Sequence, residues 1–266
     1  MLAEQLVQDG DLPAALKALQ DAVRQQPSSA RHRVFLFQLL CVLGDWPRAL
    51  TQLNVAAELD AATLPMAQTY REAIQCEALR MEVFAGKLTP LVFGAPPAWL
   101  AQLTEALKYD AIDPVRAVDA RAAAFDAAPA SGGSIDTTRF AWLADADGRL
   151  GPTLEAIVNG RYLWIPFTRI ARIEIEPPAD LRDAVWTAAA FTWANGAQTV
   201  GLIPTRYPGT TAAQGDALKL ARRTEWDGEL PLGQRMFASD AGDHALMDVR
   251  AIEFDVAADE QDDAHG

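Results

Sequence analysis

The sequence has few of the residues that usually mark a catalytic or metal site. It contains 2 cysteines and 3 histidines among 266 residues. His32, His244 and His265 do not have metal-ligand spacing with one another or with a cysteine. The G-x-S-x-G, G-x-x-x-x-G-K-[ST] and H-E-x-x-H motifs are all missing. We therefore predict no catalytic, cofactor or metal site, although a serine or cysteine could still meet a histidine in the folded chain.

Long apolar runs are missing as well. No run approaches the roughly 18 residues that a membrane-spanning helix needs. The first ten residues, MLAEQLVQDG, contain neither the basic nor the apolar region of a secretory signal. Cys41 and Cys76 lie in apolar, helix-like contexts, which favours buried thiols over a disulfide and suits a reducing compartment. We expect a cytoplasmic protein without membrane insertion.

Basic residues are scarce. The chain has 36 acidic and 23 basic residues, a formal net charge of −13 and a pI near 4.6. This charge would repel the phosphates of a nucleic acid and an anionic membrane surface. It favours instead a partner that presents basic groups. The last ten residues, 257–266, form an acidic tail that we predict to be disordered.

The first 60 residues contain an internal repeat. GDLPAALKALQDAVRQQ starts at Gly10 and GDWPRALTQLNVAAELD at Gly44, an offset of 34 residues. This is the period of tetratricopeptide repeats, in which pairs of helices stack. Glycine permits the tight turn, aspartate caps the next helix, and proline suits its first turn. Leucines at helical spacing then fill the seam between helices.

Helical patterns continue to residue 128. They cover 66–85, 96–109 and 114–128, the last with Asp113 as N-cap and Pro114 at the first helical position. We therefore expect six or seven helices in one α-solenoid-like layer. The run APASGGS that follows, at 128–134, is typical of a linker.

Beyond the linker, the pattern changes to strands. We predict them at 140–144, 154–158, 161–165, 172–175, 188–193, 199–203, 234–238 and 245–254. Asp147-Gly148 predicts a turn. Asn159-Gly160 and Asn195-Gly196 each predict a two-residue type I′ hairpin turn, which needs two residues with positive φ.

Together these patterns predict a multidomain protein with an α and an α+β part. A tetratricopeptide-like helical domain covers 1–130, and a β-rich α+β domain covers 135–256. This fold class indicates little about function, because helical repeats serve as scaffolds for many activities.

Aromatic residues concentrate in the second half. Along the strand that begins at Arg161, Tyr162, Trp164 and Pro166 share one face, and Leu163 and Ile165 take the other. Because both faces are apolar, we expect both to be covered. One cover is the core of the sheet itself; the other is either the helical domain or a partner, with the helical domain favoured.

Two polar clusters lie near these aromatics, at Asp180-Leu181-Arg182-Asp183 and at Arg206-Tyr207-Pro208-Gly209. In a catalytic interpretation, the two aspartates form an acid/base pair, and Arg182 or Arg206 clamps a carboxylate or phosphate. In a structural interpretation, which we favour, Asp180 caps a helical turn and Asp183 pairs with a nearby arginine.

At this point the chain resembles a known family. The motifs N-G-R-Y-x-W-I-P-F, P-P-x-D-L-R-D-x-V-W, P-x-R-Y-P-G, R-x-T-E-W and G-Q-R occur in this order between residues 159 and 235, and G-D-W-x-R-A-L-x-Q-L occurs in the first half, from Gly44. This set resembles the ImpE/TagJ family, also called SciE-type virulence proteins, which are accessory proteins of bacterial type VI secretion systems. Ala188 stands where the family pattern leads us to expect a proline.

The resemblance implies a non-enzymatic, cytoplasmic protein. It also implies binding to the small subunit of the contractile sheath, through that subunit's N-terminal helix, and an effect on sheath assembly or turnover. A partner helix buries its apolar face in a groove. The groove could lie along the helical layer or along the aromatics of the second domain. On this basis the predicted partner contacts are Tyr162, Trp164, Phe167, Leu181, Arg182, Trp186, Arg206 and Tyr207.

Two other functions stay open. One is an enzyme or small-ligand-binding protein whose pocket lies between the domains, lined by Trp164, Arg182 and Arg206. The other is a generic tetratricopeptide adaptor that binds a peptide C-terminus.

Overall fold

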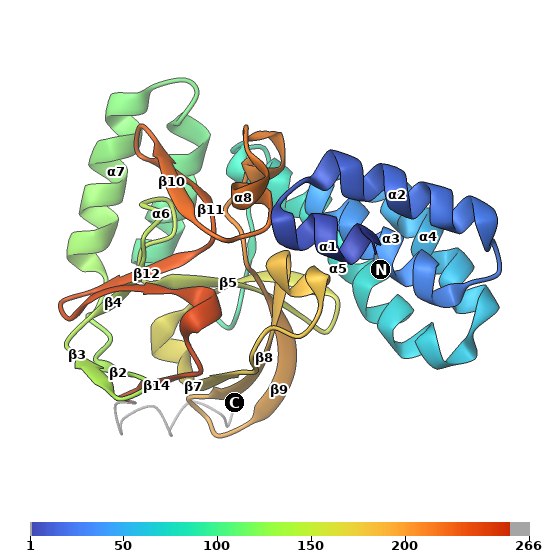
Figure 1. The fold of residues 1–266 in the computed structure, drawn as a ribbon. Coiled ribbons are helices and arrows are strands. Elements are labelled where there is room, and N and C mark those ends of the chain that lie inside the picture. Colours follow the sequence, from blue (N-terminus) through green and yellow to red (C-terminus); the bar gives the residue numbers. More distant parts are fainter. Residues whose placement is uncertain (1, 256–266) are drawn as a thin grey trace.

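The computed structural model describes residues 2–255. Five helices form one end of the molecule and a sheet-rich part forms the other (Figure 1). The predicted tail at 257–266 lies outside the described residues. The helices at this end are α1 (Leu2–Asp9), α2 (Leu12–Gln25), α3 (Ala30–Leu43), α4 (Trp46–Leu59) and α5 (Leu64–Phe84).

The internal repeat encodes two equivalent turns between helices. Gly10 and Gly44 have φ of +82° and +77°, a conformation that glycine adopts without strain. Asp11 and Asp45 follow them, and each side chain accepts a hydrogen bond from the backbone N–H three residues on. The predicted turn and cap chemistry is confirmed, whereas the tetratricopeptide-like character stays a prediction.

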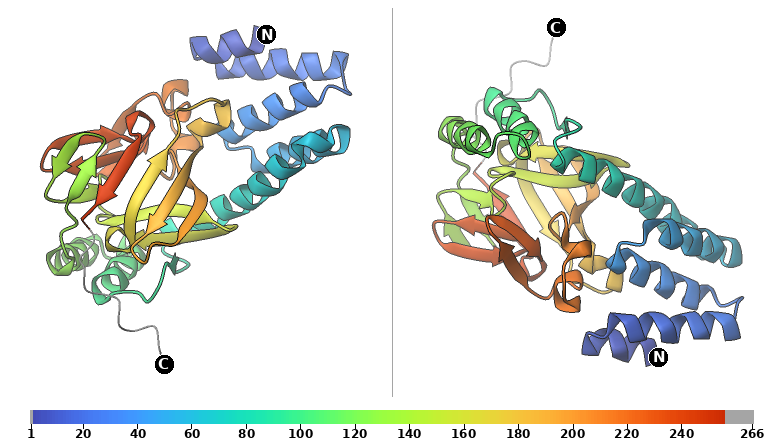
Figure 2. Two further views of the ribbon diagram at one scale, coloured as in Figure 1. Left: turned by 90° about the horizontal axis from the view of Figure 1, so that it is seen from below. Right: turned by 90° about the horizontal axis from the view of Figure 1, so that it is seen from above.

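The helices before residue 128 do not form the single layer that we expected. After Gly86, where φ is +70°, the chain crosses to the sheet as strand β1 (Leu91–Val92). It then forms a second helical unit, the hairpin of α6 (Ala98–Tyr109) and α7 (Pro114–Ala127). Figure 2 shows this hairpin against the sheet-rich part, well away from α1 and α2. The glycine- and proline-containing segment between α5 and α6 causes the break.

The main sheet has nine strands in the order β1-β6-β5-β9-β8-β7-β14-β2-β3. β1 pairs with β6 in parallel, so the mainly helical half of the chain contributes an edge strand to the sheet. The other strands of the sheet are β2 (Gly133–Ile135), β3 (Thr138–Phe140), β5 (Thr153–Val158), β6 (Arg161–Pro166), β7 (Ile170–Ile175), β8 (Trp186–Trp193), β9 (Gln198–Pro204) and β14 (Ala251–Phe254).

Two smaller sheets and a short helix complete the fold. β12 (Met236–Ser239) pairs with β13 (Gly242–Ala245) and with β4 (Leu143–Asp145). β10 (Thr224–Asp227) and β11 (Leu230–Gly233) form a separate hairpin, preceded by the short helix α8 (Asp216–Lys219). The combination of α and β parts is as predicted; the exact division at residues 130 and 135 stays a prediction.

The two Asn-Gly turns differ. Asn159 and Gly160 have φ of +50° and +70°, and they join β5 to β6 as the predicted two-residue turn. The second prediction was wrong, because only the glycine of Asn195-Gly196 has positive φ. There the Trp193 N–H donates to the Ala197 carbonyl, and the Asn195 side chain accepts from the Ala197 N–H. The Trp193–Ala197 hydrogen bond encloses three residues, so this connection is longer than the two-residue turn between β5 and β6.

Strand β6 lies between two hydrophobic cores. Tyr162 and Trp164 belong to the core that includes the helices, and the Trp164 ring lies 5.8 Å from that of Phe84 on α5. Ile165, on the other face, belongs to the core within the sheet-rich part. The favoured alternative is therefore confirmed, since the protein's own helices cover the Tyr162 face. Because this core spans both parts of the chain, they form one packed unit.

Both cysteines are free and buried, as predicted. Burial raises the pKa of the Cys41 thiol, and it raises that of Cys76 to about 11. Neither thiol therefore has the thiolate character of a reactive cysteine.

Candidate functional site

Most of the predicted partner contacts lie inside the protein. Six of the eight residues are buried: Tyr162, Trp164, Phe167, Trp186, Arg206 and Tyr207. Leu181 and Arg182 are partly exposed. A partner could reach the buried six only by displacing the contacts that they make within the chain. Their role in partner binding stays a prediction.

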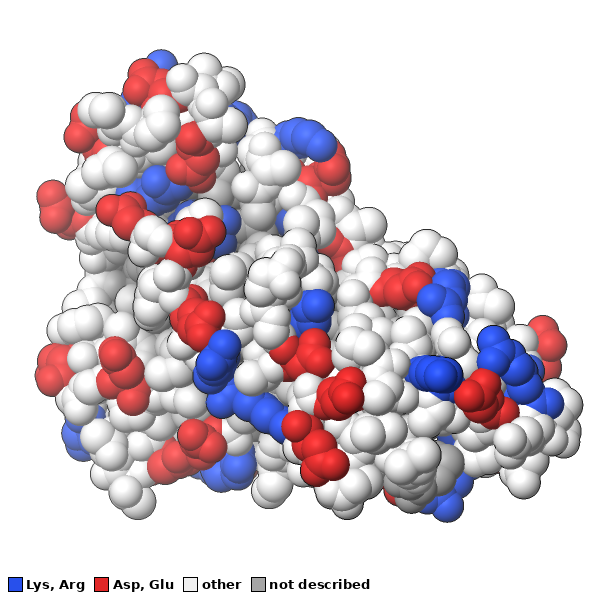
Figure 3. Space-filling model, turned by 45° about the horizontal axis from the view of Figure 1, so that its top comes forward, with Lys and Arg blue, Asp and Glu red and all other residues white. Residues whose placement is uncertain are grey.

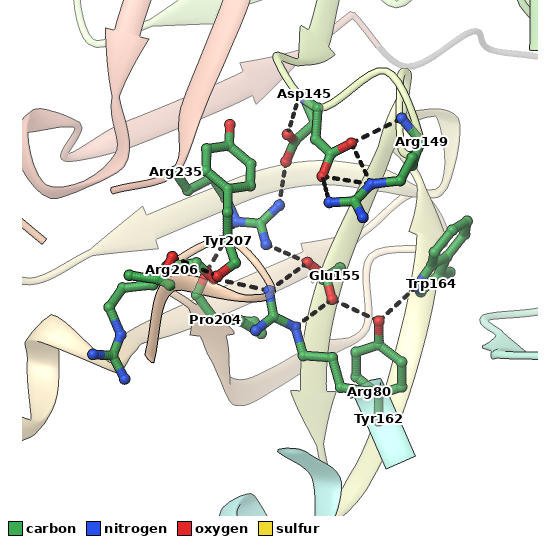
Figure 4. Close-up of polar contacts among 12 residues, drawn as sticks. Arg80, Asp145, Arg149, Glu155, Tyr162, Trp164, Pro204, Arg206, Tyr207 and Arg235 are labelled. Carbon is green, nitrogen blue, oxygen red and sulfur yellow. Dashed lines mark hydrogen bonds and ion pairs between the residues drawn. The ribbon is translucent and has the colours of Figure 1, made fainter. Parts of the chain in front are cut away.

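A buried carboxylate joins the helices to the sheet. Glu155 on β5 accepts hydrogen bonds from Arg80 Nε at 2.7 Å and Nη2 at 3.0 Å, and from the Tyr162 hydroxyl at 2.5 Å (Figure 4). Arg235 also donates to it. Trp164 Nε1 donates in turn to the Tyr162 oxygen at 2.8 Å. Strand β6, whose aromatic residues we considered as a partner-binding surface, thus contributes hydrogen bonds to a buried ionic network.

Arg80 connects this network to other elements. Its guanidinium lies 3.5 Å from Glu77 one turn earlier on α5, and donates to the Arg206 carbonyl at 2.8 Å. Trp186 Nε1 donates to the other oxygen of Glu77 at 2.9 Å. Side chains from α5, from strands β5, β6 and β8 and from Arg235, together with one backbone carbonyl, therefore satisfy one another without solvent. Such a network favours a single packing arrangement of helices on sheet.

The two carboxyl groups that share Arg235 have opposite pKa shifts. Burial raises the pKa of Glu155, but the charges of Arg80 and Arg235 outweigh burial and hold the pKa at about 2. For Asp145, burial prevails over the one paired cation, Arg235, and the neighbouring charge of Asp147 adds to the effect of burial, so the pKa rises to about 6. Glu155 is thus the more firmly charged member of the network.

Arg206 does not act as a clamp for an anion. Its guanidinium donates to the backbone carbonyls of Val42 and Lys219 at 2.7 and 2.6 Å, and to that of Cys41 at 3.2 Å. Burial lowers the pKa of Arg206 to about 10. The side chain therefore caps the C-terminal end of α3 and fastens it to the sheet-rich part, which corrects the catalytic interpretation.

The 180–183 corner is built as a cap. Asp180 and Asp183 form a reciprocal capping box around a short 3-10 helix, as the structural interpretation predicted for Asp180. The prediction for Asp183 was wrong. Its carboxylate accepts from the backbone N–H groups of Ala179 and Asp180, and Arg182 pairs with Asp180 at 2.5 Å. The carboxylates of both aspartates are therefore engaged in hydrogen bonds and an ion pair within residues 179–183.

Trp164, Arg182 and Arg206 do not line a common pocket. Trp164 and Arg206 are buried among the contacts described above, and Arg182 alone of the three lines a cavity of about 130 Å³ at the 180–183 corner. Residues 2–255 include no cluster of three metal-ligating side chains. Over the same range, no helix combines the length and apolar character needed to cross a membrane.

The structure does bring one serine close to a histidine. Ser239 Oγ and His244 Nε2 lie 3.4 Å apart across the β12–β13 hairpin. However, the hydroxyl donates to the Gly242 carbonyl at 2.9 Å and accepts from the Ala241 N–H. Its hydrogen is therefore used within the turn and not directed at the histidine.

A further cavity lies beside α7, where the sequence patterns predicted no site. It has a volume of about 340 Å³, and its lining includes Phe125, Pro129, Ser131, Trp142 and Pro152. The apolar positions of α7 carried a signal, because they recur at helical spacing. From the sequence we predicted only a helix within a helical layer, and in the structure Val115 and Val118 of this helix are exposed.

The comparisons with known proteins agree with one another. Residues 137–253 match the family model described as ImpE protein. Over 257 residues the chain is 56% identical to the type VI secretion system accessory component TagJ of Pseudomonas aeruginosa, covering 96% of this chain and 92% of that protein.

A crystal structure of a protein from Vibrio parahaemolyticus has a similar fold, with a TM-score of 0.86. It is 24% identical to this chain and covers 97% of it, and the match spans 99% of that chain. At this level of identity the likeness concerns the fold alone. The relative from Pseudomonas, by contrast, is similar enough over nearly the whole length to establish kinship, and we conclude that this chain is a member of the ImpE/TagJ family.

Proposed function

We propose that the protein is a non-enzymatic accessory component of a type VI secretion system and works in the cytoplasm. We further propose that it binds the small subunit of the contractile sheath, through that subunit's N-terminal helix, and modulates sheath assembly or turnover. One observation carries the proposal: the 56% identity to the TagJ accessory component over 96% of the chain. The sheath subunit as partner comes from the family resemblance of the sequence motifs.

The packing of the interior supports binding at the surface. The space between the helices and the sheet is filled by Trp164, Trp186 and the Arg80–Glu155 pair. A small-ligand pocket at this position, the main alternative, would need these groups to move apart. We therefore favour a function in which an exposed surface of the protein binds another protein.

The surface charges fit a partner that is bound mainly through apolar contacts. On the face seen in Figure 3, acidic and basic side chains alternate with large uncharged areas and form no extended region of one sign. The net charge of −13 favours a partner helix that carries basic residues beside its apolar face.

The proposal can be tested by measuring binding to the purified small sheath subunit of the same secretion system. The full-length subunit is expected to bind, and the same subunit without its N-terminal helix is expected not to bind. Isothermal titration would give the affinity of both. Equal binding without the helix would contradict the helix as the binding element, and absence of binding by the full-length subunit would contradict the sheath partner.

A further inference from the structure

Helix α7 exposes an apolar stripe. Val115, Val118, Ala122 and Phe125 recur at intervals of three, four and three residues, and all four are exposed. Val115 is 72% exposed and Val118 is 52% exposed, and Ile112 just before the helix is 80% exposed. These intervals are those of the seam between two paired helices. Isolated apolar side chains on a surface are common, but a continuous row along one helix is not.

Most of the stripe takes no part in the packing of α7 in its own protein. The buried residues of α7 are Ala117 and Ala124, and the helix packs against α6. The two buried side chains of the helix are thus alanines, whereas Val115 and Val118 face outward; the Phe125 ring, which is 37% exposed, packs against Gly151. Figures 1 and 2 show α7 at the outer edge of the molecule, with its outer side uncovered by other elements.

The stripe leads directly into the 340 Å³ cavity. Phe125 is the last residue of the stripe and also lines the cavity, where Pro129, Trp142 and Pro152 form other parts of the wall. In another protein, an apolar cavity of about 150 Å³ holds benzene. The present cavity therefore has room for a large aliphatic or aromatic side chain.

The cavity also contains an unused polar group. Ser131 lines it and is 9% exposed, and its Oγ has no hydrogen-bond partner within the described chain. Buried hydroxyl groups are nearly always hydrogen-bonded, because leaving one unpaired is unfavourable. This unpaired hydroxyl is itself buried, so it marks incomplete packing beside the cavity and is not a contact open to an occupant.

The charges beside the stripe indicate what kind of helix fits. Asp119 and Asp126 each follow an apolar residue of the stripe and lie seven residues apart, so they share one flank. A partner helix with lysine or arginine along the facing flank would pair with them. Arg116 follows Val115 on the same flank, so the flank as a whole has a net negative charge, which a basic partner helix complements better than a second copy of this chain does.

From these observations we propose that the α7 surface binds an amphipathic helix of a partner protein. We define the α7 surface as Val115, Val118, Ala122, Phe125 and the adjoining cavity. The partner helix places its apolar residues along the stripe, inserts one bulky side chain into the cavity, and aligns basic residues with Asp119 and Asp126. This inference rests on the proposed function, because we take the partner helix to be the N-terminal helix of the small sheath subunit.

Single substitutions test this assignment, with the purified small sheath subunit as the probe. Val118→Asp is expected to weaken binding at least tenfold, because it sets a charge in the middle of the stripe. Trp142→Ala, which opens the cavity wall, is expected to weaken it at least fivefold. Val200→Asp is the matched control: Val200 is a 76% exposed valine on β9, and its replacement is expected to change the affinity less than twofold.

The outcomes separate the two proposals. If the unchanged protein does not bind the sheath subunit, both are wrong. If it binds and both α7-surface variants bind equally well, the function stands and the α7 surface is wrong. Amide hydrogen exchange on the unchanged protein gives an answer without any variant: protection of 112–131 on binding supports the surface, and protection confined to α1–α5 overturns it. Dimerisation that Val118→Asp abolishes would show that a second copy occupies the surface, which would also overturn the proposal.

Discussion

Replacing Glu155 by glutamine removes one negative charge from a buried position where that charge has three partners. Glu155 is fully buried and receives hydrogen bonds from Arg80, Arg235 and Tyr162. Glutamine has nearly the same shape but cannot balance two guanidinium groups. Glu155→Gln therefore leaves two buried positive charges without their shared counter-charge, while it creates no cavity.

Two estimates of the cost agree. The pKa of Glu155 falls from an ordinary value of 4.5 to about 2, and a shift of this size corresponds to about 3 kcal/mol in favour of the charged form in the folded protein. Removal of one partner from a buried ion pair costs about 3–5 kcal/mol in other proteins. We therefore expect Glu155→Gln to lower the free energy of unfolding by about 3–5 kcal/mol at pH 7.

Urea unfolding, followed by tryptophan fluorescence, would measure this difference, and Asp145→Asn is its control. Asp145 also pairs with Arg235, but burial raises its pKa to about 6, so that its charge is held less firmly at neutral pH. We expect the control to cost at least about 2 kcal/mol less than Glu155→Gln. A loss below about 1 kcal/mol for Glu155→Gln, or equal losses for the two variants, would refute the view that Glu155 is the centre of the network.

Two further predictions concern acid and backbone geometry. Because the pKa of Glu155 is depressed in the folded state, its contribution to stability is present above pH 4.5 and is lost as the pH falls towards 2. The difference in the free energy of unfolding between the wild type and Glu155→Gln should therefore shrink to less than half by about pH 3. A constant difference across this pH range would contradict the assigned pKa. The second prediction compares two glycines: a Cβ added at Gly133 would lie 2.0 Å from the Glu253 carbonyl oxygen, whereas one added at Gly148 would meet nothing within 4 Å. Gly133→Ala should lower the free energy of unfolding by at least about 2 kcal/mol, and Gly148→Ala by less than about 0.5 kcal/mol. Similar thermal unfolding of the two variants would contradict the tight pairing of β2 with β14.

Local features of the fold were predictable because their causes lie within a few residues. Gly10 and Gly44, each followed by an aspartate, specify a turn and a helix cap without help from the rest of the chain. Asn159-Gly160 likewise specifies a two-residue turn. Asn195-Gly196 has the same two letters but forms a longer loop, because a hydrogen bond between Trp193 and Ala197 closes the connection differently. Turn type thus depends also on the register of the strands on either side.

The arrangement of the helices was harder to predict. The strand at Leu91–Val92 is two residues long and has no pattern of its own; it exists because β6 offers it an edge. This strand separates the α6–α7 hairpin from the first five helices. An apolar stripe on α7 indicates a helix in either case, but periodicity alone does not tell whether the stripe packs inside or lies exposed.

In the candidate site, too, some features follow from the local sequence and others depend on tertiary packing. The sequence by itself identified the family, the repeated helix caps, the first hairpin and the apolar character of both faces of β6, since each depends on residue types in a fixed order. Only the tertiary structure decided that Arg80 meets Glu155 across 75 residues of chain. It likewise decided that Arg206 fastens α3 and that α7 turns its valines outward. These contacts depend on which elements pack together, and that packing follows from the burial of both cores at once and from no single stretch of sequence.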